Sequence, residues 1–378
     1  MTDFYERSGI CKYLGKIDIF AEGKTYMYYL NPNIENLYRI FDQNERKDYL
    51  RLDLNENPGG FSEEFISAVL ADITPQFVSQ YPETLHFTQV LADYLGTDIS
   101  HLCLVNGSAE GIRYIIQAFT SENGRIVGVV PSYFMFQVYS EMYGRNFVKV
   151  PYNEDLSMDV ESIISELTED TQLLILLNPN NPMGNVYTDE EFEKIFKFAH
   201  EKKINILIDE AYHYFYPKTF IKYALEGEHV FITRTFSKLF SMAGCRLGYV
   251  VGWPEGIKMV QKMCTPHNTN AFAMKFAEAV LTTPGMVDSL ISNFISGRKY
   301  LVEWLDKNGY LHKGEAGNFI FIEPKTDAQT IVDRMKAEKK ILIKTYPNVG
   351  RFGNCLRVSI GEQKYMEQFT AALEDLDR

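Results

Sequence analysis

The chain contains few cysteines, and they are scattered. Cys11, Cys103, Cys245, Cys264 and Cys355 are odd in number among 378 residues, and none forms a C-x-x-C pair. This pattern argues against a disulfide framework and against a cysteine-based metal site. It is typical of reduced thiols, and we therefore expect a cytoplasmic protein.

Long apolar runs and an excess of positive charge are also lacking. No run approaches the length of a membrane span, and residues 1–9 (MTDFYERSG) lack the apolar core of a signal peptide. The formal net charge of −12 disfavours general binding to nucleic acids or anionic membranes. We expect neither kind of partner.

Several motifs that would carry other chemistries are missing. The chain has no HExxH metal motif, and no GxGxxG dinucleotide fingerprint follows its early strands. Gly309 and Gly314 have the spacing of a phosphate-binding loop, but Glu315 stands where that loop needs lysine. We expect no metal site and no nicotinamide-type dehydrogenase.

What the chain does contain is a regular alternation of short apolar segments with helical stretches. Hydrophobic residues make up 46% of the chain and charged residues 23%, as in ordinary globular proteins. The apolar segments predict buried strands at residues 101–105, 125–130, 172–177, 204–209, 230–234 and 247–252. Strands alternating with helices, such as residues 189–203, predict a mostly parallel α/β sheet covered on both faces.

The pattern changes near residue 270. Residues 271–285 and 286–309 have the character of long helices, and shorter strands mixed with helices follow. We therefore expect an N-terminal arm (1–51), a large domain (52–270) and a smaller α+β C-terminal domain (271–378).

Polar residues follow several of the predicted strands. Asp209 ends one strand, Asn181 and Lys238 follow two others, and Ser108 opens a helix after the strand at 101–105. In open α/β sheets, ligands bind at the edge where the strands end. Each residue also has a structural explanation: Ser108 as a helix N-cap, Asp209 as a cap or ion-pair partner, Lys238 as a surface lysine, and residues 178–184 as a turn.

The order of nine short segments along the chain decides between the ligand-binding and the structural interpretations. The segments are LDLNENPGG, YPE, NGSAEGI, PSYFMF, NPNNPMGN, DEAYHYF, TFSKLFSMAGCRLGYV, GNFIFIE and CLRVSIG, between about Leu52 and Gly361. In them the chain resembles the fold-type I aminotransferases that use pyridoxal 5′-phosphate (PLP), and most closely the histidinol-phosphate aminotransferase group. The resemblance implies a large domain with a mostly parallel mixed sheet covered by helices, plus a smaller α+β C-terminal domain.

The resemblance also implies roles for residues around PLP. It makes Lys238 the lysine that binds the cofactor and then moves the proton, and Asp209 the partner of the pyridine nitrogen. Asn181 and Tyr212 match donors to the phenolic oxygen, and Tyr133 matches the aromatic residue that stacks on the ring. The phosphate-binding group would comprise Ser108, Ala109, Thr235 or Ser237, and Arg246, and Glu110 would belong to the wider cofactor site.

Two further sets follow from the resemblance. Tyr81 matches a tyrosine that reaches the phosphate from the neighbouring subunit, which implies a homodimer. Tyr81 as a simple packed aromatic residue and Ser237 as a helix cap remain alternatives. The residues that match substrate-contacting positions are Arg357, Lys344, Asn57 and Tyr38.

The departures from the family pattern concern the substrate. Lys344 stands where histidinol-phosphate aminotransferases carry a second arginine that holds the substrate phosphate, and Arg351 lies nearby in the sequence. Lysine binds phosphate as a point charge, without the bidentate fork of arginine. We still expect ping-pong transfer of an amino group from histidinol phosphate, or a related amino acid or amine, to a 2-oxo acid such as 2-oxoglutarate.

Two alternatives keep the same cofactor. One is a PLP-dependent decarboxylase of the threonine-phosphate type, which differs in releasing CO2. The other is a non-catalytic PLP-binding regulatory domain, which usually accompanies a DNA-binding module. The acidic N-terminal arm shows no basic helix-turn-helix pattern, which disfavours that reading.

Overall fold

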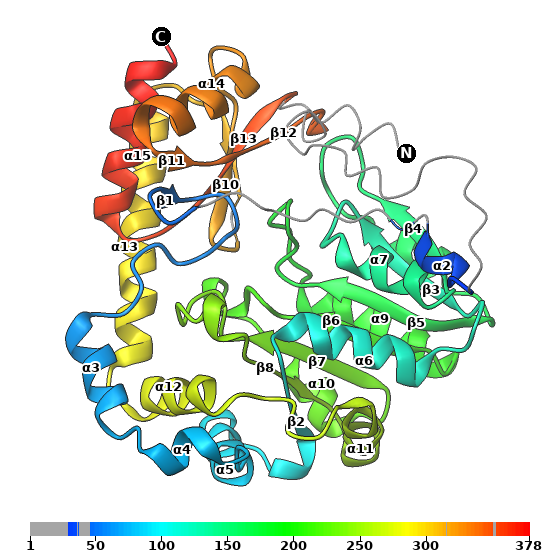
Figure 1. Cartoon of the computed structure of the whole chain (residues 1–378). Coiled ribbons are helices and arrows are strands. Elements are labelled where there is room, and N and C mark those ends of the chain that lie inside the picture. The colour runs from blue at the N-terminus through cyan, green and yellow to red at the C-terminus, as the bar shows by residue number, and fades with distance from the viewer. Residues whose placement is uncertain (1–28, 36, 38–45, 315, 351–352) are drawn as a thin grey trace.

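A seven-stranded sheet forms the centre of the larger part of the molecule (Figure 1). The structure, a computed structural model, describes residues 29–35, 37, 46–314, 316–350 and 353–378. The strand order is β2-β8-β7-β6-β5-β3-β4, and only β8 runs antiparallel to its neighbours. The bounds are β2 (Leu102–Val105), β3 (Arg125–Val130), β4 (Asn146–Pro151), β5 (Thr171–Leu177), β6 (Asn205–Asp209), β7 (Val230–Thr235) and β8 (Gly248–Val251). The prediction of a mostly parallel sheet is confirmed.

The edge strand β4 was not predicted. It pairs with β3 alone, and most of its residues are only partly buried or exposed. A strand at the edge of a sheet needs no continuous apolar run, so Lys149 and the terminal Asn146 and Pro151 hide the pattern.

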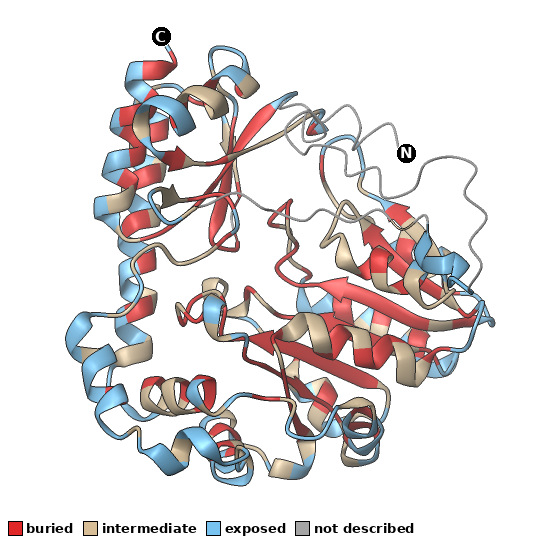
Figure 2. Cartoon of the chain, viewed as in Figure 1, coloured by how far each residue is buried: buried red, intermediate tan, exposed pale blue. Residues whose placement is uncertain are grey.

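Successive side chains of the central strands enter two different cores, one on each face of the sheet. Ile206 and Ile208 pack on one face and Leu207 on the other, which is the period of two expected for a strand. Figure 2 shows the central strands coloured mostly as buried. The first face is covered by α5 (Leu85–Leu95), α8 (Val160–Ser165), α9 (Asp189–Glu201), α10 (Ile221–Glu226) and α12 (Ala271–Thr282), and the second by α6 (Ser108–Phe119), α7 (Met135–Met142) and α11 (Pro254–Met263).

Helix α6 follows β2 after a turn of two residues. Ile112, Ile115 and Ile116 are completely buried against the sheet, as their helical spacing predicts. This burial fixes the direction of α6, so that its first turn lies at the edge of the sheet where β2 ends.

A second, smaller sheet is antiparallel and has the order β12-β13-β10-β9. Its strands are β9 (His312–Lys313), β10 (Phe319–Ile322), β12 (Lys344–Tyr346) and β13 (Cys355–Ser359). Its core contains apolar residues from α13 (Met286–Lys307), α14 (Ala328–Arg334), a π-helical turn (Met335–Lys339) and α15 (Gln363–Leu376). In Figure 1, α13 and α15 run side by side along this part of the molecule.

The segment before the large sheet belongs partly to the smaller unit. Strand β1 (Leu50–Arg51) pairs in parallel with β11 (Ile341–Leu342), and Leu52 is completely buried in the smaller core. Residues 53–58 then continue towards the large sheet. The remaining elements are α2 (Pro32–Glu35), α3 (Glu63–Ala71), α4 (Pro75–Ser79) and the 3-10 turns Ile99–His101, His213–Phe215 and Ala243–Cys245.

The expected division at residue 270 falls just before α12. Ala273, Met274 and Ala277 of that helix pack in the core of the larger unit, as does Leu290 early in α13. Phe294, one turn later, belongs to the smaller core. We therefore propose that the two units meet inside α13, between Leu290 and Phe294. Within the described part of the chain, no helix is long and apolar enough to cross a membrane.

Candidate active site

The carboxyl end of the large sheet brings together polar residues from four separate strands. β2, β5, β6 and β7 point in the same direction, because β2 and β7 are both antiparallel to β8, which lies between them. Asp209 ends β6, Thr235 ends β7, Ser108 follows β2, and Asn181 lies in the turn after β5. This is the edge at which open α/β sheets bind ligands.

Asp209 is a buried carboxylate without a cationic partner in contact. Its residue is 2% exposed, and its Oδ1 accepts hydrogen bonds from Thr233 Oγ1 at 3.0 Å and from the Ala211 N–H at 3.2 Å. Burial raises its pKa to about 7, against the opposing effect of these bonds and of nearby Lys238.

Glu210, the residue after Asp209, is also buried but does have a cationic partner. It forms an ion pair with Arg234 at 2.7 Å. No basic side chain among the described residues lies within ion-pair distance of Asp209. A buried acid without such a partner suits a bound cationic group.

Lys238 turns its amine towards the segment that arrives from the smaller unit. Nζ donates to the Leu54 carbonyl oxygen at 3.0 Å and lies 5.7 Å from the centre of the Tyr212 ring. Burial, followed by the positive charges of Arg357 and Arg246, lowers its pKa to about 8. A larger fraction of the amine is therefore neutral near physiological pH, as a nucleophile requires.

The Tyr212 hydroxyl is the centre of a hydrogen-bond network between the two units. It accepts from Asn181 Nδ2 and from Asn55 Nδ2, each at 3.0 Å. Arg357 joins this network by donating to Asn181 Oδ1 at 2.8 Å and to the Asp53 carbonyl oxygen at 2.6 Å. The network thus connects Asn181 and Tyr212, which follow strands of the large sheet, to Arg357 of β13.

Sequence reasoning missed Asn55. It lies in the matching segment LNENP, but no role was given to it. The feature of the sequence that could have pointed to Asn55 is its residue type. Asparagine tolerates the left-handed backbone that Asn55 adopts at φ +56°. Only the structure shows that it contacts Tyr212.

Arg246 lies directly against the first turn of α6. Gly107, the N-cap residue, has φ +75°, and a Cβ at this position would come within 2.5 Å of Arg246 Nη2. Ser237 Oγ accepts from Arg246 Nη1 at 3.1 Å and from Thr235 Oγ1 at 2.9 Å. The first N–H groups of a helix have no partner within the helix. Together with the guanidinium and the hydroxyl groups, they form a site suited to a phosphate.

Neither serine acts as the cap that the sequence allowed as an alternative. Gly107, not Ser108, occupies the N-cap of α6, and no side-chain cap bond is made there. Ser237 bonds Arg246 and Thr235 instead of a helix terminus.

Glu110 and Tyr133, two further residues expected at the cofactor, contact other parts of their own chain. The Glu110 carboxylate accepts from Asn106 N–H at 2.7 Å, and its own N–H donates to the Gly107 carbonyl at 3.1 Å. Glu110 thus ties the turn before α6 and offers no donor to a phosphate. Tyr133 packs edge-on against Phe136, and burial raises its pKa, with Asp209 and Tyr212 near enough to contribute.

The expected substrate residues are distributed over different places. Lys344 and Arg357 are directly opposite each other on β12 and β13, so their side chains leave the same face of the sheet. Arg357 is 4% exposed, and its guanidinium carbon lies 5.2 Å from the centre of the Tyr346 ring. Tyr38 and Arg351 lie outside the described residues.

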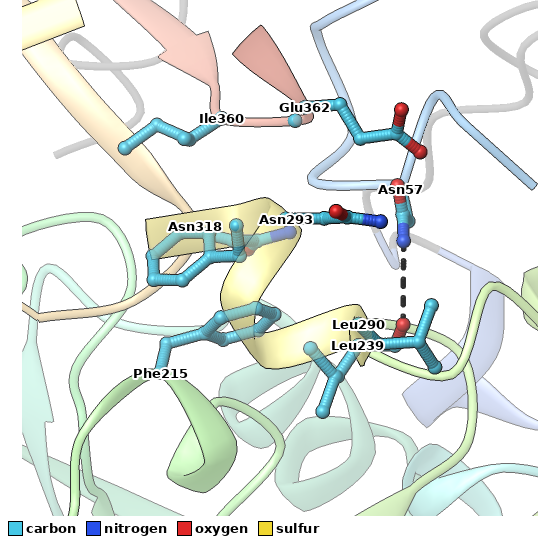
Figure 3. Close-up of a pocket in the computed structure, with 10 residues that line it drawn as sticks. Asn57, Phe215, Leu239, Leu290, Asn293, Asn318, Ile360 and Glu362 are labelled. Carbon is cyan, nitrogen blue, oxygen red and sulfur yellow. Dashed lines mark hydrogen bonds between the residues drawn. The ribbon is translucent and has the colours of Figure 1, made fainter. Parts of the chain in front are cut away.

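Asn57 faces a separate small cavity between the two units (Figure 3). Its Nδ2 donates to the Leu239 carbonyl at 3.3 Å, and Asn293 and Asn318 line the same space. The cavity has a volume of about 10 Å³, room for one water molecule at most. It is therefore not a substrate pocket.

Tyr81 lies on the surface after α4. It is 77% exposed and stacks on the His267 ring with 4.3 Å between ring centres. Among the residues that the structure describes, no hydrogen bond joins its hydroxyl to Ser108, Ser237 or Arg246 of the same chain.

Comparison with known proteins agrees with this geometry. Residues 47–373 match the family of class I and II aminotransferases. The chain is 30% identical over 330 residues to a histidinol-phosphate aminotransferase of a Thermoanaerobacter species, an alignment covering 86% of this chain and 92% of that protein. It is 29% identical to the histidinol-phosphate aminotransferase of Caldanaerobacter subterraneus subsp. tengcongensis, with the same coverage of both chains.

A solved structure shares the fold. The histidinol-phosphate aminotransferase of Sinorhizobium meliloti, crystallised with pyridoxal 5′-phosphate, superposes with a TM-score of 0.81 at 22% identity, covering 94% of this chain and 99% of that one. The fold and the match define a fold-type I transferase. The chain belongs to the class I and II aminotransferases. It is an enzyme that uses PLP to move an amino group between an amino donor and a 2-oxo acid.

The residues present fit this cofactor. A buried carboxylate without a cation in contact, an amine with a lowered pKa and a cationic helix N-terminus lie along one edge of the sheet. These groups match a pyridine nitrogen, an aldehyde and a phosphate in chemical type.

Proposed function

We propose that the carboxyl edge of the large sheet holds PLP and that the amino donor of this aminotransferase is histidinol phosphate, with 2-oxoglutarate as acceptor. The observation that carries the assignment of the site is Asp209, a buried carboxylate whose partners are a hydroxyl and an N–H. The donor is supported by the relatives described above, which are histidinol-phosphate aminotransferases.

Each residue then has a physical task. Bound PLP supplies an electron sink for the charge left when a proton leaves the carbon that bears the amine. Asp209 keeps a proton on the ring nitrogen, because an anion at this depth stabilises a neighbouring cation. Asn181 and Tyr212 would donate to the phenolic oxygen, and Tyr133 would cover the ring. The Lys238 amine, with its lowered pKa, takes and returns the proton.

The phosphate would be held by Ser108, Ala109, Thr235, Ser237 and Arg246. The support is the contact between the Arg246 guanidinium and the first turn of α6. Glu110 is left out of this group, because its carboxylate and its N–H both have partners in the turn before α6.

Arg357 and Lys344 would bind the anionic group of either substrate in turn. Both reactants of the proposed pair carry negative charge, and in a ping-pong reaction they use one site successively. Two cations on the same face of the β12–β13 pair suit a phosphate or a carboxylate. Asn57 is not included, since it lines the small cavity of Figure 3. Tyr38 stays a prediction from the resemblance alone.

A donor screen tests the reaction. Purified protein loaded with PLP is given 2-oxoglutarate and one amine at a time, with histidinol phosphate, aromatic amino acids and threonine phosphate included. The expected result is glutamate formed fastest with histidinol phosphate. Release of CO2 from threonine phosphate without glutamate would instead support the decarboxylase, which the comparisons do not favour. No turnover with any donor would contradict the proposal.

We also propose a homodimer in which Tyr81 serves the neighbouring site. Exposed apolar residues lie on α3, on and just after α4, at the start of α5 and on α12, and exposed apolar side chains of this kind suit a protein interface. They are Ile66, Leu70, Val78, Tyr81, Leu85 and Phe272. The free thiols of Cys103, Cys245, Cys264 and Cys355 support a reducing, cytoplasmic compartment.

Hybrid dimers test the exchange of Tyr81. Tyr81→Phe alone should weaken PLP binding by about tenfold, because a hydrogen bond to a charged group is lost. When Tyr81→Phe and Lys238→Ala chains are co-expressed with different tags, the hybrid has one doubly altered site and one intact site. The hybrid should therefore bind PLP at one site with wild-type affinity. If Tyr81 acted within its own chain, no intact site would form.

A further inference from the structure

Asn55 contacts the proposed active site from the segment that links the two units, and no role has been assigned to it. It is 1% exposed, and its Nδ2 donates to the Tyr212 hydroxyl at 3.0 Å. Tyr212 lies 157 positions further along the chain. The contact therefore exists only in the folded protein.

The surroundings of Asn55 hold its side chain in one orientation. The Asn55 N–H donates to Ser359 Oγ at 2.8 Å, and Ser359 Oγ donates to Asn55 Oδ1 at 3.3 Å. Asn318 Nδ2 donates to the Asn55 carbonyl at 3.1 Å. With Oδ1 accepting from Ser359, the amide nitrogen is the end that meets Tyr212.

Two amide donors thus converge on one hydroxyl oxygen. Asn55 Nδ2 and Asn181 Nδ2 both donate to Tyr212, and a phenolic oxygen has two acceptor positions. The hydroxyl proton must then point elsewhere. Burial raises the pKa of Tyr212 to about 12, and the bond from Asn55 acts in the opposite direction, which makes the hydroxyl a better donor.

We propose that Asn55 is a positioning residue: by donating to the Tyr212 oxygen, it turns the Tyr212 hydroxyl proton towards the phenolic oxygen of bound PLP. The inference rests on the proposed site for the cofactor. Asn181 alone would leave one acceptor position of the Tyr212 oxygen open and the hydroxyl free to rotate. Asn55 occupies that position and so fixes the direction in which Tyr212 donates.

The property to measure is the pH midpoint of the visible absorbance of bound PLP. A hydrogen bond to the phenolic oxygen reduces the attraction of that oxygen for a nearby proton, so losing the bond moves the midpoint upward. The charged and titratable groups that face Tyr212 are Lys238, Asp209, Arg357, Tyr346 and Tyr133. All five stay unchanged in the variants below.

Two substitutions separate the role of the side chain from that of the backbone. Asn55→Gly removes the amide without strain, because glycine adopts φ +56° freely. It should raise the midpoint by roughly half a pH unit. Asn55→Asp keeps the shape but accepts the Tyr212 proton instead of donating to its oxygen, and it should raise the midpoint by about one unit.

Asn318→Ala is the matched control. It removes the hydrogen bond to the Asn55 carbonyl oxygen but leaves both bonds of the Asn55 side chain, from Ser359 and to Tyr212. It should lower the melting temperature to a similar extent as Asn55→Gly while the midpoint stays constant. An equal shift in Asn318→Ala would mean that Asn55 is only structural, and the proposal would fail.

A double-mutant cycle with Tyr212→Phe completes the test. If Asn55 acts through the hydroxyl, Asn55→Gly should shift the midpoint in the wild-type background and have no further effect in Tyr212→Phe. Equal shifts in both backgrounds, or no shift in either, would overturn the proposal. Failure of the wild-type protein to bind PLP would overturn the site itself, and so both proposals.

Discussion

The cofactor-facing and substrate-facing sides of the candidate site are built from different kinds of sheet. Asp209 ends one of the strands that point the same way in the large sheet, and Lys238 and Ser108 follow two others. Arg357 and Lys344 lie within two neighbouring antiparallel strands of the small sheet. On the first side the topology brings strand ends together, whereas on the second the register decides which side chains meet.

This difference affects how each side tolerates change. Residues at the ends of buried parallel strands are held by the two cores that cover the large sheet. A shift of one residue between β12 and β13 would turn Lys344 to the opposite face from Arg357. We therefore expect changes on the cofactor side to affect every substrate alike, and changes on the substrate side to discriminate between substrates.

The largest expected effect belongs to the cofactor side. Lys238→Ala should reduce turnover at least about a thousandfold with every donor, because no other amine takes its place. Turnover is measured with glutamate as the product, and circular dichroism checks the fold. Borohydride should trap PLP on Lys238 in the wild-type protein only. Multiple turnover by the variant without an added amine would contradict its role.

Asp209→Asn should separate function from stability. It should lower kcat by about a hundredfold or more for all donors, because the ring nitrogen loses its anionic partner. The cofactor-free protein should become more stable at about pH 8, by on the order of 2 kcal/mol, because the cost of a buried unpaired charge disappears.

The sign of this effect follows from the pKa of Asp209, which folding raises from 3.8 to about 7. Between these values the folded state binds more protons than the unfolded one. The stability contributed by the protonated acid is therefore lost as the pH rises through this window. Unfolding by urea at a series of pH values should show the gain from Asp209→Asn shrinking towards acidic pH. A gain that is equal at all pH values would contradict the assignment.

On the substrate side, Arg357→Lys should lower kcat/KM by about a hundredfold for substrates whose anionic group accepts two hydrogen bonds from the guanidinium. Lysine loses the second hydrogen bond, and the contact with Asn181 is lost as well. The absorbance of bound PLP should remain. Equal losses for charged and uncharged donors would show that the two sides of the site do not act separately.

The smallest effect is expected for Lys344→Arg. Restoring the bidentate cation should raise kcat/KM for histidinol phosphate by several-fold, about threefold to tenfold, and leave donors without phosphate unchanged. Steady-state kinetics with histidinol phosphate and an aromatic amino acid side by side measure this. A decrease for histidinol phosphate alone would mean that Lys344 already suits the natural donor better than arginine does.

Much of the large sheet could be predicted from the sequence, because buried parallel strands are continuous apolar runs. Residues 172–177 and 204–209 illustrate this, and they correspond to β5 and β6. The edge strand β4 could not be predicted, since an exposed strand needs no such run. The position of α12 was also hidden, because an amphipathic helix does not reveal which core it will join.

The sequence by itself determined the class of this protein, through the order of the motifs that contain Asp209, Lys238 and Arg357, and through the strand pattern that carries the first two to one edge. Only the tertiary structure decided that Asn55 meets Tyr212, that Lys344 shares a face with Arg357, and that Asn57 lines a separate cavity. The physical reason is the separation in sequence of the residues that must meet. A strand end is specified by residues next to it, whereas the contacts of Asn55 and Asn57 depend on how two separately packed cores are joined. The shared face of Lys344 and Arg357 depends on the register of two strands.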